Sequence, residues 1–188
     1  SIITDTHRSV MEVMEYLWGM GHRQIAFIGG IEFDTDGKEV RDYRLSAYTK
    51  FMEMQRRFRA DYVKIGSYTP RDGYRLGMEL LSQEGEMPTA ILAANDSIAV
   101  GCYRAIREKS LRIPEDVSVI GFNDISMAKY LVPPLTTVHI HMNFMGREAV
   151  ALLAERIQTG RDISMHISIP ANLVIRESVA RIEHEKQR

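Results

Sequence analysis

Short apolar runs alternate with stretches of helical spacing along most of this chain, and this alternation constrains the fold more than any other feature. Residues 25–28, 90–94 and 117–122 are such runs, and each stops at glycine or at an Asn-Asp pair. Runs of this length between turn-forming residues are typical of strands covered on both faces. Between them, apolar residues recur every three or four positions, as on one face of a helix. The pattern predicts an α/β fold with a parallel, doubly wound sheet.

Capping residues and apolar spacing indicate where the helices lie. They are expected after Asp5 and Thr6, over about 40–55, after Thr69-Pro70, after Asn95-Asp96, and from Asn143 to Gly160. Threonine and asparagine cap helix starts, and proline suits the first helical position. The inner faces should include Tyr74, Met78 and Leu81 in the third helix and Met145, Ala149, Leu152 and Leu153 in the last. Residues 31–38 are polar and lack a period, so we expect a loop.

Composition and charge limit the classes of function. Hydrophobic residues make up 45% of the 188 residues and charged residues 26%, as in ordinary soluble domains. The formal net charge of −1 provides no basic field for nucleic acid, and no apolar run is long enough to span a bilayer. Cys102 is the only cysteine, which fits a reducing compartment, the cytoplasm. Because residues 1–3 already have a strand pattern, we expect the C-terminal part of a longer protein.

The short motifs of common catalysts with this fold are missing from the sequence. There is neither a G-x-x-x-x-G-K-[ST] phosphate loop nor a G-x-S-x-G nucleophile elbow, and Gly29-Gly30 lacks the further glycine of a dinucleotide fingerprint. His139 and His141 alternate along a strand and could begin a zinc site, but no third ligand stands at a recognisable spacing. We therefore predict no catalytic residue, metal or cofactor.

A more specific signal comes from polar and aromatic residues that follow the predicted strands. These residues are Asn95 with Asp96, Asn123 with Asp124, Tyr68, and Arg44 near the start of a helix. The carboxyl ends of parallel strands meet at one edge of the sheet, where ligands bind. Amides, a carboxylate, a guanidinium and a ring suit a polyol, whose hydroxyls donate and accept while its apolar face packs on the ring. Each residue alone could be a cap or a turn, but their convergence predicts a binding cleft.

Several segments together resemble the LacI/GalR family of bacterial transcription repressors, specifically their effector-binding core. They are residues 21–26, 41–44 with Tyr48, 88–91 with Asn95-Asp96, 113–122, 133–138, Met145-Gly146 with Ala149, and 176–178. Each segment is short, but their order and their spread over nearly the whole chain make the set specific. Residues 138–141 with Met145-Gly146 are most similar to repressors of β-galactosidase operons.

The resemblance implies a two-lobed core like that of class I periplasmic sugar-binding proteins, with an incomplete first lobe. Residues 1–21 with 140–164 would form this partial N-terminal lobe, residues 22–138 with 167–180 the C-terminal lobe, and residues 181–188 a flexible tail. The family's helix-turn-helix is absent, so operator DNA would be bound by the parent protein and not by this chain. The family forms homodimers along the core, for which Val100, Leu131 and Val132 are interface candidates.

The resemblance also implies which residues contact the effector. Carried over position by position, the contacts fall on Arg44, Tyr68, Asn95 and Asn123, with Asp5 and Arg8 on the first-lobe side of the cleft. Tyr68 stands where a ring packs on a sugar. The family commonly has aspartate where this chain has Asn123, which weakens one acceptor. Asp124 is expected to hold its loop rather than to meet the ligand.

These observations support the hypothesis of a non-enzymatic sugar sensor, the effector-binding part of a cytoplasmic repressor. Two alternatives stay open at this point. One is a secreted or periplasmic sugar-binding protein of the same two-lobed architecture, which a signal peptide upstream would identify. The other is a doubly wound enzyme that uses Asp96, Asp124 and a histidine, although no nucleophile–base spacing supports it.

Overall fold

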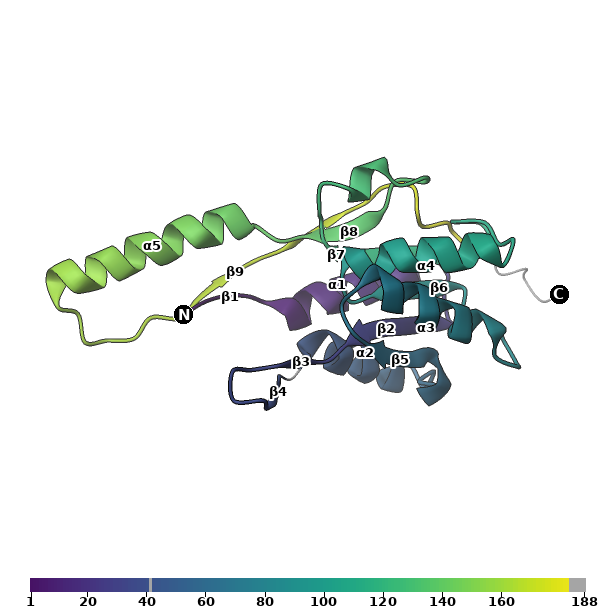
Figure 1. Cartoon of the computed structure of the whole chain (residues 1–188), viewed down its shortest axis with the longest axis horizontal. Coiled ribbons are helices and arrows are strands. Elements are labelled where there is room, and N and C mark those ends of the chain that lie inside the picture. The colour runs from purple at the N-terminus through teal and green to yellow at the C-terminus, as the bar shows by residue number, and fades with distance from the viewer. Residues whose placement is uncertain (41, 183–188) are drawn as a thin grey trace.

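A six-stranded sheet forms the centre of the computed structural model, which describes residues 1–40 and 42–182 (Figure 1). The strands, in spatial order, are β10 (Asn172–Val174), β8 (Thr136–His139), β7 (Ser118–Asn123), β6 (Ala90–Ala93), β2 (Ile25–Gly30) and β5 (Val63–Gly66). All neighbours pair in parallel except β10, which is antiparallel to β8. Because β2 and β6 carry buried residues throughout, both faces of the sheet are covered.

Four helices cover this sheet and complete what we call the larger lobe. Helix α1 (Thr6–Gly19) packs against α2 (Tyr43–Met54), and α3 (Pro70–Ser82) packs against α4 (Asp96–Glu108). After β2 the chain runs through α2 to β5 at one edge, and α3 then returns it to β6 on the other side of β2. This reversal is the mark of a doubly wound fold, so the predicted fold class is confirmed.

Helices α3 and α4 approach each other closely through glycines. A Cβ added at Gly73 would collide with the backbone of Ile98, and one at Gly101 would collide with the carbonyl oxygen of Pro70. The buried positions of α3 are Gly73, Leu76, Gly77 and Leu80. Of the predicted inner face, Leu81 packs against the core, but Tyr74 and Met78 do not belong to it. The prediction was wrong for these two because the contact with α4 is made through small residues that an apolar pattern does not register.

The segment predicted as a loop contains a small hairpin instead. Strands β3 (Glu32–Phe33) and β4 (Glu39–Val40) pair antiparallel, with Glu32 opposite Val40. The side chain of Asp34 accepts hydrogen bonds from the backbone N–H groups of Asp36 and Lys38 and so holds the turn. Helix α2 consequently begins at Tyr43, later than the predicted start near residue 40. Arg41 lies outside the described residues.

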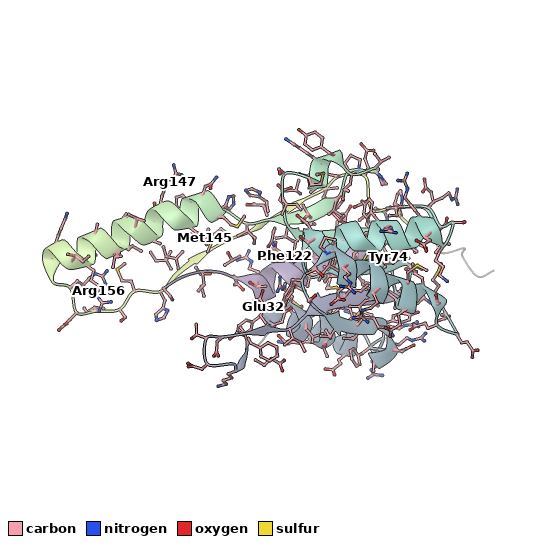
Figure 2. The ribbon with its side chains drawn as sticks, viewed as in Figure 1. Glu32, Tyr74, Phe122, Met145, Arg147 and Arg156 are labelled. Carbon is pink, nitrogen blue, oxygen red and sulfur yellow. The ribbon has the colours of Figure 1, made fainter. Side chains whose placement is uncertain are left out.

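Three further elements form a smaller lobe, which Figure 1 shows at the left of the molecule. Strand β1 (Ile2–Thr4) pairs in parallel with β9 (Ile167–Ile169), and helix α5 (Met142–Thr159) contacts β1. Met145, Arg147 and Arg156 on α5 stand away from the larger lobe (Figure 2).

The apolar face of α5 is covered only in part by the described residues. Helix α5 buries none of its residues, and Leu153 is 60% exposed. Met145, Ala149, Leu152 and Leu153 do face the rest of the smaller lobe, as expected: Met145 Sδ accepts from Thr4 Oγ1 at 3.4 Å, and the other three line a groove with Ser1 and Ile2. None of the four is buried, since little more than β1 and β9 is available for α5 to pack on. The cap position is His141 rather than Asn143, whereas Gly160 ends the helix in the left-handed conformation as expected.

The division between the lobes differs from the predicted one at α1. Four apolar residues of this helix, Val10, Val13, Met14 and Leu17, are buried in the core of the larger lobe. Since residues 1–21 were assigned together to the smaller lobe, the predicted crossing at residues 21–22 is one helix too late. The chain instead passes between the lobes near Asp5, near His141 and near Pro170.

Residues 181–188 were predicted to form a flexible tail. Of these, residues 183–188 lie outside the described residues. The second residue of this segment contacts the end of α1, where the backbone N–H of Ile182 donates to the carbonyl oxygen of Met20 at 2.8 Å. In the described part of the chain, no helix has the length and apolar content that a membrane span requires.

Candidate functional site

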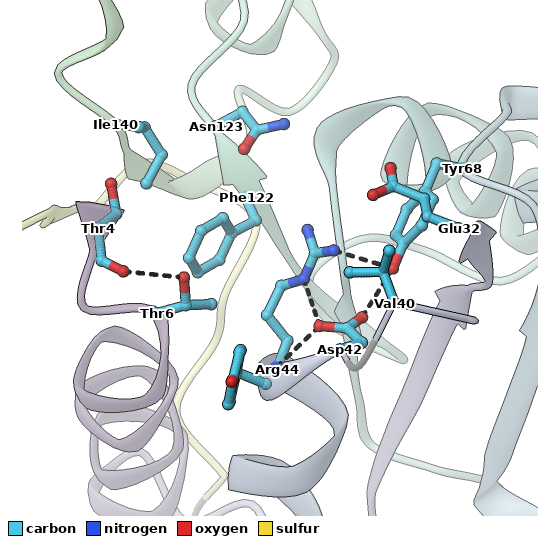
Figure 3. A pocket seen from close by; sticks show the side chains of 11 residues that line it. Thr4, Thr6, Glu32, Val40, Asp42, Arg44, Tyr68, Phe122, Asn123 and Ile140 are labelled. Carbon is cyan, nitrogen blue, oxygen red and sulfur yellow. Dashed lines mark hydrogen bonds and ion pairs between the residues drawn. The ribbon is translucent and has the colours of Figure 1, made fainter. Parts of the chain in front are cut away.

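A pocket of about 280 Å³ opens beyond the carboxyl ends of β2, β5 and β7, next to the segments that lead to the smaller lobe (Figure 3). Ligands of doubly wound proteins bind at this edge of the sheet, and the volume is near the lower end of the range for small-molecule sites. The wall is formed by Thr4, Thr6, Glu32, Val40, Asp42, Tyr43, Arg44, Tyr68, Phe122, Asn123 and Ile140.

Arg44 is the best-fixed polar group in this pocket. Its Nε donates to Asp42 Oδ1 at 2.9 Å, one Nη donates to the carbonyl oxygen of Ala94 at 2.6 Å, and the other donates to the Tyr68 hydroxyl at 2.9 Å. The guanidinium carbon lies 4.9 Å from the centre of the Tyr68 ring. These contacts hold a planar group in one orientation before any ligand arrives, which is the preorganisation that binding sites need.

Asp42 joins the two neighbouring groups into one network. It caps α2 by accepting from the backbone N–H of Arg44 at 2.8 Å, and it accepts from the Tyr68 hydroxyl at 2.8 Å. Burial raises the pKa of Tyr68 to about 12, opposed by the Arg44 charge and assisted by the hydrogen bond to Asp42 and the charges of Asp42 and Glu32. The phenol therefore remains a hydrogen-bond donor at neutral pH.

Asn123 stands at the end of β7, on the wall opposite Asp42 in Figure 3. Its φ of 109° lies in the region that favours glycine, and Asp124 follows with a φ of 55°. Asparagine and aspartate tolerate such conformations better than most residues. The half-buried amide of Asn123 makes no hydrogen bond to another described side chain or backbone group, so both its donor and its acceptor are available to a ligand.

Asp124 points away from the pocket and ties its loop to neighbouring elements, as expected from the sequence. Its carboxylate accepts from His139 Nδ1 at 3.0 Å and from a guanidinium nitrogen of Arg176 at 2.7 Å. Burial alone would raise the pKa of Asp124, but the hydrogen bonds and charges of Arg176 and His139 lower it below the usual value. The Asp124 carboxylate is thus ionised, and both of its oxygens are already hydrogen-bonded within the protein.

Asn95 lies near the pocket, but its side chain is used for structure. Its Oδ1 caps α4 by accepting from the N–H of Ile98 at 2.8 Å, and its Nδ2 donates to the carbonyl oxygen of Tyr68 at 3.3 Å. The adjacent Asp96 is fully buried and accepts from Thr137 at 2.6 Å, and burial raises its pKa. Asn95 therefore positions the loop that carries Tyr68 and is not part of the pocket wall.

Asp5 and Arg8 lie outside this pocket. Asp5 caps α1 by accepting from the backbone N–H of Arg8 at 3.0 Å, and the Arg8 side chain, 75% exposed, pairs with Glu12 at 3.0 Å. Both line a neighbouring groove together with Ser168 and Pro170. Of the six predicted contacts, the structure brings Arg44, Tyr68 and Asn123 together in one pocket.

Sequence reasoning missed several residues of the pocket, above all Asp42 and Glu32. Asp42 directly precedes a helix, which is the signature of an N-cap, but the expected helix start near residue 40 concealed it. Glu32 belongs to the hairpin that was predicted as a loop. Phe122 was recognised as the end of a buried strand, and no sequence signal indicated that its ring reaches the ligand edge.

The chemistry of the described residues gives little support to a metal or nucleophile site. Among residues 1–40 and 42–182, no three His, Cys, Asp or Glu side chains are grouped to hold a metal. His139 and His141 meet edge to face with their ring centres 4.8 Å apart, and each also bonds a neighbouring side chain. Cys102 is buried, which raises the pKa of its thiol to about 12.

Comparison with known proteins shows what this chain is similar to. Residues 14–179 match the family described as the periplasmic binding protein-like domain. The chain is 33% identical over 180 residues to the transcriptional regulator GalR of Lacticaseibacillus casei, covering 95% of this chain and 54% of that protein. It is 38% identical over 166 residues to the repressor PurR of Pasteurella multocida, covering 88% and 48%. The chain therefore spans about half the length of these relatives.

Solved structures agree with this relationship. A LacI transcriptional regulator from Bacillus cereus subsp. cytotoxis superposes with a TM-score of 0.87 at 28% identity, over 97% of this chain and 63% of that one. A LacI family regulator from Enterococcus faecium with bound ribose gives 0.82 at 26%, over 97% and 65%, and a complex of the regulator CelR with cellobiose gives 0.84 at 29%, over 94% and 53%. The chain belongs to the periplasmic binding protein-like family, and the relatives and solved structures that it resembles are named as transcriptional regulators, several of them of the LacI family.

Proposed function

We propose that this chain is the sugar-sensing part of a cytoplasmic transcriptional repressor. The observation that carries the proposal is the fixed Arg44–Asp42–Tyr68 network, which faces Asn123 and Phe122 across one pocket. Guanidinium and amide groups hydrogen-bond to hydroxyls, and the rings of Tyr68 and Phe122 suit the apolar face of a sugar. Structurally similar regulators with bound ribose and with cellobiose support the same class of ligand.

The proposed mechanism is a change in the angle between the lobes. Thr4, Thr6 and Ile140 lie at or next to two of the passages between the lobes and also line the pocket. A ligand that contacts these three residues and Arg44 at the same time favours the arrangement of the lobes in which both sides of the pocket lie within contact distance of it. Because a ligand shifts an equilibrium only by its difference in affinity for the two states, these bridging contacts are what would convert binding into a signal.

The parent protein would read this signal through operator DNA. In this proposal the DNA-binding part lies outside the present chain, and the protein works as a homodimer without catalysing a reaction. Val100, Leu131 and Val132 stay as interface candidates, and all three line one apolar surface beside Tyr103 on α4. The low net charge supports the assignment of DNA contacts to another part of the protein.

A sugar screen on the full-length parent protein tests this function. Ribose, galactose, cellobiose and lactose are added in turn while thermal unfolding and operator binding are followed. At least one sugar should raise the unfolding temperature and change the affinity for operator. If no sugar stabilises the protein and operator binding is unaffected by all of them, the proposal is wrong.

A pair of arginine variants tests the site itself. Arg44→Lys keeps the charge but removes the planar donor set that bonds Asp42, Ala94 and Tyr68, so affinity for the stabilising sugar should fall by about tenfold or more. Arg75→Lys is the matched control, because Arg75 lies on the exposed side of α3. Isothermal titration should give the control the affinity of the unaltered protein. Equal sugar affinities for the two variants would show that Arg44 does not contribute to sugar binding.

A further inference from the structure

The β3–β4 hairpin contributes one wall of the pocket. Glu32 and Val40 are directly opposite each other in the two strands, so their side chains lie on the same face of the hairpin, and both line the pocket (Figure 3). Phe33 and Glu39 form the next pair and therefore face the other way. The hairpin thus presents one carboxylate to the pocket and another away from it.

The charges of the pocket wall are unbalanced. Among the described residues that line it, the charged side chains are the carboxylates of Glu32 and Asp42 and the guanidinium of Arg44, and these three sum to one net negative charge. The Arg44 charge is already matched by Asp42 at 2.9 Å. Among the described residues, no group donates a hydrogen bond to the Glu32 carboxylate. Its oxygens are free to accept from a ligand, and its charge acts on whatever enters.

The two helix N-termini at this wall, those of α1 and α2, offer no compensating site for an anion. Helix α1 begins at the pocket residue Thr6, and its N-terminus is capped by the carboxylate of Asp5, which accepts from the N–H of Arg8 at 3.0 Å. The N-terminus of α2 carries the partial positive charge of its unpaired N–H groups, which elsewhere binds phosphate. Here the carboxylate of Asp42 occupies that position and accepts from the N–H of Arg44 at 2.8 Å. An incoming phosphate would have to displace Asp42 from both Arg44 and Tyr68, and it would still meet Glu32.

We propose that this pocket selects uncharged sugars over their phosphate esters, and that Glu32 is the hairpin residue that accepts from ligand hydroxyls and repels anions. This inference rests on the proposed sugar-sensing function and narrows it to one ligand class. Sugar hydroxyls suit a wall that carries carboxylates because each can donate to one oxygen while accepting from Arg44 or Asn123. A phosphate group can only accept near Glu32, and its charge is repelled.

Paired titrations of the full-length protein test the selectivity. Ribose, galactose and glucose are each compared with their monophosphate esters by isothermal titration at low and high salt. The unesterified member of the pair that binds should have at least about tenfold higher affinity, and the gap should narrow with added salt as the repulsion is screened. An ester that binds as tightly as its parent sugar, or more tightly, overturns the inference while leaving sugar sensing intact. If no member of any pair binds, both proposals fall.

Two glutamate variants test the role of the hairpin residue. Glu32→Gln removes the charge but keeps the size, so the preference over the ester should shrink by about fivefold or more. Glu39→Gln is the matched control on the opposite face of the same hairpin and should keep the original preference. Both glutamates are exposed, so neither change should alter thermal unfolding of the free protein. Identical preferences in the two variants would show that Glu32 does not set the selectivity.

Discussion

Asp42 determines how the side chains of the pocket are arranged, although it is not the residue that the family resemblance indicated. It bonds both Arg44 and Tyr68, so the two predicted contacts are held at a fixed separation by a third residue. The sequence predicted that Arg44, Tyr68 and Asn123 lie at one edge of the sheet, because Tyr68 and Asn123 follow strands and Arg44 stands near the start of a helix. The structure brings all three into one pocket. The sequence could not show that the amide of Asn95 is used up by capping α4, since cap and ligand contacts demand the same residue type.

Asp124 gives a prediction at the scale of single residues, which concerns how folding stability depends on pH. Its pKa is lower in the folded than in the unfolded protein, so its contribution to stability is complete above about pH 4, the usual carboxyl value. The contribution is lost as pH falls through the lower, folded pKa. Asp124→Asn should therefore reduce the free energy of unfolding at pH 7 by about 1–3 kcal/mol, because Arg176 loses a partly buried partner.

Denaturant unfolding at several pH values measures this effect. The difference between Asp124→Asn and the unaltered chain should be constant around neutral pH and shrink as the solution becomes strongly acidic. Asp162→Asn, at an exposed position of the smaller lobe, is the control and should be neutral. A difference that grows toward acid would mean that Asp124 is destabilising in its ionised form.

At the scale of elements, the order of strands and helices followed from the sequence, whereas the face through which α3 contacts α4 did not. The apolar runs predicted β2, β6 and β7 because a strand covered on both faces needs no partner information to be recognised. The predicted inner face of α3 was largely wrong, because α3 contacts α4 through glycines. The β3–β4 hairpin escaped prediction because strands of two residues are too short to show a period.

The interface between α3 and α4 can be tested with two glycine variants. Gly101→Ala places a Cβ against the backbone of Pro70 and Tyr74, so the helices must separate, and the free energy of unfolding should fall by about 1–3 kcal/mol. Gly146→Ala in α5 meets nothing within 4 Å and should cause no loss, since alanine favours helix. Thermal or denaturant unfolding decides between them. Equal stability of both variants would mean that α3 and α4 can separate without cost.

At the scale of the whole molecule, the two lobes differ in what stabilises them. The larger lobe has a continuous core that includes α1 through α4 and the six-stranded sheet. The smaller lobe consists of β1, β9 and α5 and leaves the apolar residues Val150, Leu153 and Ile157 exposed. The family resemblance predicted that the first lobe is incomplete, but apolar spacing alone could not reveal which helix is left uncovered, because the same spacing marks a helix whether or not its partner elements are present.

Hydrogen exchange of this 188-residue chain should therefore divide it along the lobe boundary. Helix α5 buries no residue, and an isolated helix of 18 residues is only marginally stable in water, so its amides should exchange orders of magnitude faster than those of α4. Mass spectrometry of peptides from the two helices measures the ratio, and β7 provides a buried reference within the same lobe as α4. Protection of α5 equal to that of α4 at every protein concentration would show that contacts within the chain stabilise it. Protection that rises with concentration would instead mean that α5 is covered by a second copy, because association depends on concentration and intrachain packing does not.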